Sequence, residues 1–82
     1  MITLYSKEGC SACDKARLLL KKLKAKFRER RVDRSQKAFV ASLDASGTFS
    51  VPVLDIGGKV IAGYREKEIK RAVQYLNGKN LR

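Results

Sequence analysis

The sequence predicts an α/β fold in which a mixed four-stranded sheet has helices on both faces. Short segments rich in β-forming residues alternate with longer segments whose apolar residues recur at helical spacing. These segments follow one another in the order β-α-β-α-β-β-α, which implies parallel strands joined by a right-handed crossover and then an antiparallel hairpin. We expect the 82 residues to form one domain, residues 1–82, with a small hydrophobic core.

The first strand and helix are expected at the N-terminus. Residues 2–5 alternate apolar and polar side chains and are rich in β-forming types, which predicts a strand. A helix is expected from Ala12 or Cys13 onward, because apolar residues then recur at helical spacing while lysines fall outside that face. The apolar face consists of Cys13, Ala16, Leu19, Leu20 and Leu23.

The second strand and helix are more polar. Residues 27–32 are expected to form a strand rich in arginine, a composition that suits an exposed sheet edge. Ser35 is the expected N-cap of a helix that runs to residue 43, and Ser46-Gly47 ends this unit. The buried side of the helix is expected to consist of Ala38, Phe39, Val40 and Leu43.

A hairpin and a covering helix complete the chain. Residues 51–56 are expected to form a strand that Pro52, the only proline, interrupts near its start. Gly57-Gly58 is a two-residue hairpin signal, and residues 59–62 form the returning strand. The last helix is expected from residue 65 to about residue 76, closed by Asn77-Gly78. Its apolar stripe consists of Ile69, Ala72, Val73 and Leu76.

Composition and charge narrow the range of partners. With 44% hydrophobic and 33% charged residues, the chain is expected to be globular, and no apolar run reaches the roughly 20 residues of a membrane span. No signal-peptide pattern is present, so we expect a cytoplasmic protein without a membrane partner. The net charge is +11, and residues 15–37 contribute +9 of it, with eleven Lys or Arg against Glu29 and Asp33. A solvated basic flank and a patch for an acidic partner or nucleic acid both account for this segment.

Cys10 and Cys13, the only cysteines, stand three positions apart at the predicted strand-to-helix junction. Disulfide exchange needs a thiolate that attacks, a second thiol that closes on it and access to solvent, and this placement meets all three needs. The helix N-terminus offers unpaired N–H groups and partial positive charge, so the pKa of Cys10 is expected to fall below about 8.5. Nearby lysines favour the thiolate and nearby carboxylates oppose it. Cys13, one turn further along, is expected to be less exposed and to resolve the intermediate.

Two other interpretations of the cysteine pair stay open. A structural zinc site usually takes four Cys or His ligands, and this chain has two cysteines and no histidine. A metal site would therefore need carboxylates or a second subunit. The pair could also be buried and inert. The lack of histidine argues against nucleophilic catalysis of the Cys-His type as well. Redox exchange, with no metal ligand, is the interpretation we favour.

Pro52 is a second candidate site residue. Taken alone, it suits the start or edge of a strand. In the predicted topology, however, it lies beside the loop that contains Cys10. A cis bond between Val51 and Pro52 would turn backbone N–H and C=O groups toward Cys10, where they could pair with an extended substrate.

Two stretches of the chain resemble a known family. L-Y-S-K-E-G-C-S-A-C and S-V-P-V-L-D-I-G-G-K-V-I-A-G-Y-R together resemble the glutaredoxin branch of the thioredoxin superfamily, over essentially the full chain. The resemblance implies a thioredoxin-like fold and thiol–disulfide exchange, with Cys10 as the nucleophile, Cys13 as the resolving cysteine and Pro52 as the cis-proline. It implies protein disulfides as substrates. We expect a monomer with no bound cofactor.

Departures from the family pattern concern the electron donor. Glutaredoxins usually have Pro-Tyr between the cysteines, where this chain has Ser11-Ala12. They also tend to have an acidic residue where Tyr64 and Arg65 follow Gly63 here. A-G-Y-R-E-K-E-I is more similar to the glutaredoxin-like redoxins that reduce ribonucleotide reductase and generally take electrons from thioredoxin reductase. Glutathione and thioredoxin reductase with NADPH are therefore the two expected donors.

The expected substrate-binding set flanks the cysteines and Pro52. Lys7 is a candidate contact for a substrate carboxylate, or an ordinary exposed loop lysine. Tyr64 is expected either beside the cysteine loop or at the edge of the core. The full set is Lys7, Ser11, Ala12, Val51, Pro52, Gly63 and Tyr64.

Two rival functional classes also stay open. One is a nucleic-acid-binding module that uses residues 15–37. Phe27 is the only aromatic residue in that segment, so no aromatic stacking platform is evident and nucleic acid is not expected as a partner. The other is a dimeric metal or iron–sulfur carrier that uses Cys10.

Overall fold

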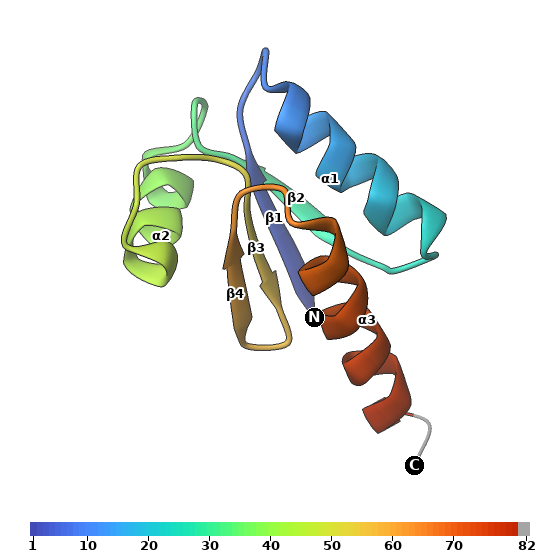
Figure 1. Ribbon diagram of the computed structural model, residues 1–82. Coiled ribbons are helices and arrows are strands. Elements are labelled where there is room, and N and C mark those ends of the chain that lie inside the picture. Colours follow the sequence, from blue (N-terminus) through green and yellow to red (C-terminus); the bar gives the residue numbers. More distant parts are fainter. Residues whose placement is uncertain (81–82) are drawn as a thin grey trace.

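A mixed four-stranded sheet forms the centre of the molecule (Figure 1), in a computed structural model that describes residues 1–80, with side chains to residue 78. The strands are β1 (Ile2–Ser6), β2 (Arg28–Arg31), β3 (Val53–Ile56) and β4 (Lys59–Ala62). The helices are α1 (Ser11–Lys22), α2 (Gln36–Ser46) and α3 (Glu66–Asn80). This order confirms the predicted β-α-β-α-β-β-α arrangement.

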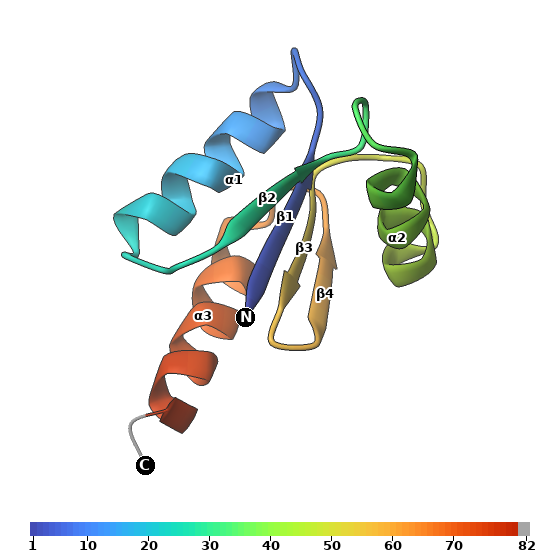
Figure 2. The same cartoon turned by 180° about the vertical axis from the view of Figure 1, so that it is seen from behind.

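The sheet has the strand order β2-β1-β3-β4. β1 is parallel to β2 and antiparallel to β3, and β3 is antiparallel to β4. Helices α1 and α3 cover one face and α2 covers the other (Figures 1 and 2). The arginine-rich β2 is an edge strand, as its composition predicts. No helix in the described part of the chain combines the length and apolar character needed to cross a membrane.

The hydrophobic core includes buried residues of the sheet and of α1 and α3. The apolar faces predicted for the two helices are confirmed, because Ala16 and Leu20 of α1 and Ile69 of α3 are fully buried. Burial of a large aliphatic side chain contributes about 1.5–3 kcal/mol, so this packing holds α1 firmly on the sheet. The cluster consists of Ile2, Leu4, Ala16, Leu19, Leu20, Leu54, Ile56, Ile61, Ile69 and Val73.

Three predicted boundaries are wrong by two residues or more, and several others differ by a single residue. β3 begins at Val53 rather than at residue 51, because Pro52 has no N–H to donate to a neighbouring strand. Helix α2 continues to Ser46, where Gly47 ends it with a φ of 71°, a conformation that favours glycine. Helix α3 continues past Asn77-Gly78 to Asn80, since a glycine inside a helix costs only about 1 kcal/mol.

The buried side of α2 also differs from the prediction. Ser35 is the N-cap, as predicted, and its Oγ accepts the Ala38 N–H at 3.2 Å. Ala38 and Ser42 are the buried residues, because a spacing of four places them on the same helix face. Val40 is 46% exposed, so the expectation that it is buried is wrong. Phe39 is partly buried and stacks on Phe49 at 5.9 Å.

Candidate redox site

Four segments converge at one end of the sheet, in the upper part of Figure 1. At the end of β1, Ser6 lies opposite Arg31 of β2, and Tyr5 lies opposite Val53 of β3. The chain therefore leaves β1 and β2, enters β3 and leaves β4 at this end. The converging segments are residues 7–13, 32–34, 51–52 and 63–64.

The cysteine pair lies where the first of these segments enters α1. Cys10 is the N-cap of the helix, and its Sγ accepts the Cys13 N–H at 3.1 Å. Gly9, with a φ of 72°, turns the chain into this position. The two cysteines form a disulfide, with their Cα atoms 5.2 Å apart. Cys13 is fully buried and Cys10 is partly exposed, which agrees with the expected difference in access.

The cap geometry has a chemical consequence for the reduced pair. An N–H group that donates to Sγ favours a negatively charged sulfur, as does the positive end of the helix dipole. Both act on Cys10, the cysteine that solvent reaches. The arrangement therefore suits a Cys10 thiolate as the reactive group and Cys13 as the enclosed partner thiol.

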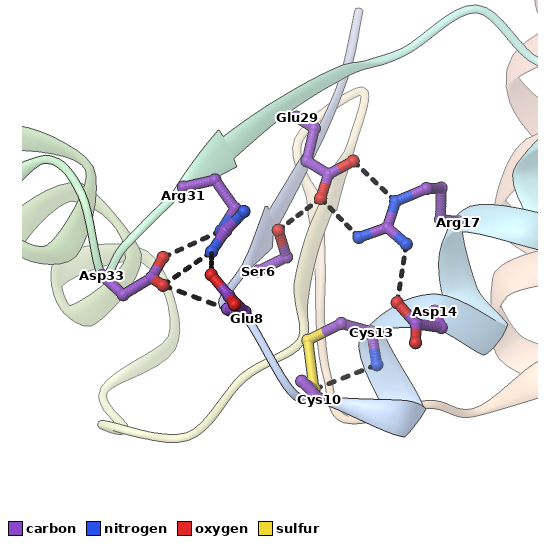
Figure 3. The surroundings of a disulfide bond; sticks show 9 residues. All are labelled: Ser6, Glu8, Cys10, Cys13, Asp14, Arg17, Glu29, Arg31 and Asp33. Atoms are coloured by element: carbon purple, nitrogen blue, oxygen red, sulfur yellow. Dashed lines mark hydrogen bonds and ion pairs between the residues drawn. A yellow bond between two sulfur atoms is a disulfide. The ribbon is translucent and has the colours of Figure 1, made fainter.

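An ionic cluster lies on the sheet side of the cysteines (Figure 3). Arg17 Nε and Nη2 donate to the two carboxylate oxygens of Glu29 at 2.8 and 2.6 Å, and its Nη1 donates to Asp14 Oδ1 at 2.7 Å. Glu29 also accepts a hydrogen bond from the hydroxyl of Ser6, which is fully buried. The Arg17 hydrogen bonds, followed by that of Ser6, lower the pKa of Glu29 to about 2. The Glu29 carboxylate is thus ionised at neutral pH.

A second polar cluster holds the loop before Cys10. Arg31 donates to both carboxylate oxygens of Asp33, at 2.8 and 2.7 Å. The backbone N–H of Glu8 donates to Asp33 Oδ2 at 3.2 Å, and the Glu8 carboxylate lies 3.5 Å from Arg31. The hydrogen bond from Arg31 lowers the pKa of Asp33 below its usual range. This cluster connects the cysteine loop to the end of β2.

Pro52 and its neighbours lie at the same end of the sheet as the cysteines. The Val51–Pro52 peptide bond is cis, as the family resemblance implies. Pro52 is buried, and its carbonyl accepts the Gly63 N–H at 2.7 Å. Val51 and Gly63 are partly exposed.

The other predicted site residues differ in exposure. Lys7 and Ser11 are exposed and Ala12 is partly exposed, all within the segment that contains the cysteines. Tyr64 is partly buried and packs against the hydrophobic core, which supports the interpretation of it as an edge-of-core residue. A role for these residues in substrate binding stays a prediction.

The structure gives two observations on the rival nucleic-acid and metal hypotheses. Phe27 packs against the core and is only partly exposed, so it offers no open stacking platform. Within the described residues, no group of three or more His, Cys, Asp or Glu side chains is arranged to hold a metal ion.

The polar residues that surround the cysteines were not predicted from the sequence. Arg17, Glu29 and Asp33 contributed to the prediction only as charges, and Ser6 only as part of the stretch that resembles the family. Two signals were available, namely the spacing of three between Asp14 and Arg17 and the period-two alternation that places Glu29 and Arg31 on one face of β2. Neither signal identifies which residue of another strand or helix each of these side chains contacts.

Comparison with known proteins identifies the family. The family model described as Glutaredoxin matches residues 2–61. The chain belongs to the glutaredoxin family. It is a glutaredoxin-family redox protein with a Cys10–Cys13 pair, and proteins of this family generally act as thiol–disulfide oxidoreductases. No curated protein is a significant match by sequence.

Solved structures of similar proteins agree with this assignment. The glutaredoxin grx-1 from Archaeoglobus fulgidus is 26% identical, with 88% of this chain and 84% of that chain covered and a TM-score of 0.82. Methanosarcina acetivorans methanoredoxin is 27% identical, with 88% and 82% covered and a TM-score of 0.81. The glutaredoxin-like NrdH-redoxin from Escherichia coli is 28% identical, with 85% and 91% covered and a TM-score of 0.76. The predicted thioredoxin-like glutaredoxin fold is confirmed.

Proposed function

We propose that this protein is a dithiol–disulfide oxidoreductase that reduces protein disulfides, with Cys10 as the nucleophile and Cys13 as the resolving cysteine. The observation that supports these roles is the asymmetry of the pair. Cys10 is partly exposed and its sulfur accepts an N–H from the first turn of α1, whereas Cys13 is fully buried. An incoming disulfide can therefore reach only the first of the two sulfurs.

The proposed reaction has two exchange steps. The Cys10 thiolate attacks one sulfur of the substrate disulfide, that S–S bond breaks, and the other substrate sulfur leaves as a thiolate that takes up a proton. Cys13 then loses its proton and attacks Cys10 Sγ, which breaks the mixed disulfide and releases the second substrate thiol. The substrate gains two electrons and two protons, and the Cys10–Cys13 disulfide forms. The partly exposed Val51 and Gly63, with Lys7, are proposed to contact the substrate chain.

An external donor must then return two electrons to the disulfide. We propose thioredoxin reductase with NADPH, with glutathione as the alternative. Similarity to NrdH-redoxin, whose activity profile is thioredoxin-like, supports the first donor, and similarity to the Archaeoglobus fulgidus glutaredoxin supports the second. Ribonucleotide reductase is accordingly a candidate substrate. The proposal retains the expected monomeric state and cytoplasmic location.

Reduction of insulin disulfides tests the proposed roles. The wild-type protein should reduce insulin, Cys10→Ser should be inactive, and Cys13→Ser should accumulate a mixed disulfide that dithiothreitol releases. An inactive wild-type protein, beside an active known redoxin in the same assay, would overturn the proposal. The donor is identified by supplying the oxidised protein with thioredoxin reductase and NADPH in one reaction, and with glutathione, glutathione reductase and NADPH in another.

A further inference from the structure

The cluster centred on Arg17 joins the three elements that position the cysteines. Arg17 donates to Asp14, the residue that follows Cys13 on α1, and to Glu29 on β2. Glu29 in turn binds the hydroxyl of Ser6, the last residue of β1, from which the cysteine loop departs. The Arg17 and Glu29 side chains are only 27% and 25% exposed. Solvent therefore screens their charges less than it screens fully exposed ones.

The charges at this end of the sheet come from several elements. They are Lys7 and Glu8 before Cys10, Asp14, Lys15 and Arg17 on α1, Glu29 and Arg31 on β2, Asp33 and Arg34 after β2, and Arg65 after β4. Arg31 is paired with Asp33 and Glu8, while Arg65 lies 3.6 Å from Glu68. Among the described residues, Arg17 is the only cation within 4 Å of the Asp14 and Glu29 carboxylates.

The sum of charges in this cluster is what each substitution changes. Asp14, Glu29 and Arg17 together carry a charge of −1. Loss of the Arg17 charge makes the sum −2, whereas loss of the Glu29 charge makes it 0. A thiolate on Cys10 exists only in the reduced state, so a more negative cluster disfavours the reduced form and a neutral cluster favours it.

We propose that Arg17 and Glu29 are positioning residues that set the reduction potential of the Cys10–Cys13 pair in opposite directions. Arg17 stabilises the reduced state and makes the pair a weaker reductant, while Glu29 has the reverse effect. The couple is the Cys10–Cys13 disulfide plus two electrons and one proton, which gives the Cys10 thiolate and the Cys13 thiol. This inference rests on the proposed function, because it concerns the same exchange reaction.

The test measures the equilibrium of each variant with a series of reduced and oxidised dithiothreitol buffers at pH 7. The fraction of reduced protein is read from the mass added by a thiol-alkylating reagent. Arg17→Met should shift the equilibrium constant toward the disulfide, and Glu29→Gln should shift it toward the dithiol. We expect each shift to be about threefold to tenfold, or about 15 to 30 mV for a two-electron couple.

Matched variants separate this effect from net charge and from folding. Lys21→Met and Asp44→Asn make the same charge changes at exposed positions far along α1 and on α2, and they should leave the potential unchanged. Arg17→Lys keeps the charge without the two-pronged hydrogen bond and should remain near wild type. The double variant Arg17→Met, Glu29→Gln should return most of the way to wild type, because it removes both charges.

The signs of the shifts decide the outcome. Shifts of the same sign, or no shift beyond that of the controls, would show that the cluster is only structural and would overturn the inference. If Arg17→Met does not fold, Glu29→Gln and Arg17→Lys still decide it, because they must differ in potential. A wild-type protein that does not exchange with dithiothreitol at all would instead refute the proposed function, so the two failures are distinguishable.

Discussion

At the cysteine end of the sheet, hydrogen bonds and ion pairs between charged side chains hold the loops, whereas at the hairpin end packing against α3 adds to hydrogen bonds of Gly57 and Gly58. Near the cysteines, Arg17 and Arg31 each organise a cluster of polar groups. At the other end, Gly57 lies directly against Leu76, beside a groove of about 380 Å³. Loops that run over the surface have little apolar cover, and at the cysteine end polar groups position them.

The largest effect on stability is expected from a substitution in the hydrophobic core. Leu20→Ala removes a fully buried side chain from α1 and should lower the free energy of unfolding by about 2–5 kcal/mol, as measured by urea denaturation. Leu18→Ala, at a 64% exposed position of the same helix, is the control and should change it by less than about 0.5 kcal/mol. If Leu20→Ala shifted the reduction potential as much as Arg17→Met does, the core and the polar cluster at the cysteine end would not have separate roles.

A smaller effect is expected at the hairpin. A Cβ atom at Gly57 would lie 2.9 Å from Leu76 Cδ1, and the φ of 60° is unfavourable for other residues. Gly57→Ala should therefore lower the melting temperature, with a loss of about 1–2 kcal/mol, and leave disulfide reduction intact. Gly78→Ala, in open space within α3, should instead raise the stability by up to about 1 kcal/mol. Impaired catalysis in Gly57→Ala would contradict the separation of the two ends.

The loss of stability at acidic pH tests the Arg17 cluster at the cysteine end. The pKa of Glu29 is lowered to about 2 in the folded protein, from an unfolded value of 4.5. Its stabilising contribution is therefore complete above about pH 4.5 and is lost as the pH falls toward 2. Urea denaturation between pH 6 and pH 2 should show a shallower decline for Glu29→Gln than for the wild type. Identical declines would mean that the ion pair with Arg17 adds no stability.

The smallest effect on stability is expected from the cluster around Asp33. Asp33→Asn weakens the acceptor of the Glu8 N–H at an exposed position, so the free energy of unfolding should change by less than about 0.5 kcal/mol. The loop before Cys10 loses a tether, and disulfide reduction should slow a few-fold. The same substitution at Asp44, an exposed residue of α2, is the control and should change neither quantity. An unchanged rate in Asp33→Asn would show that the loop is held by other contacts.

The fold and the cysteine pair could be predicted because they depend on local patterns. Helical spacing identified the buried faces of α1 and α3, and the hairpin follows from two glycines with φ of 60° and 98°. The cysteines are three residues apart, so the helix alone fixes their relation. Element ends were harder to predict, because Gly78 remains helical while Gly47 ends a helix.

The polar surroundings of the cysteines could not be predicted, because they depend on register between distant segments. Arg17 and Glu29 are 12 residues apart, and Ser6 and Glu29 are 23 residues apart. Their contacts require β2 to pair with β1 in one register and α1 to lie across the resulting face. In the sequence, Glu29 is one acid among arginines. Only the folded chain shows that it binds a fully buried hydroxyl and a partly buried guanidinium.

The hydrogen bond from the Cys13 amide to Cys10 Sγ makes this amide a spectroscopic reporter. Its acceptor is a disulfide sulfur in the oxidised protein and would be a thiolate or a thiol in the reduced one. The chemical shift and hydrogen-exchange rate of this single proton should therefore follow both the oxidation and the ionisation of Cys10. A pH titration of the reduced, ¹⁵N-labelled protein should thus follow the ionisation of the Cys10 thiol through the Cys13 amide, without a chemical probe attached to either cysteine.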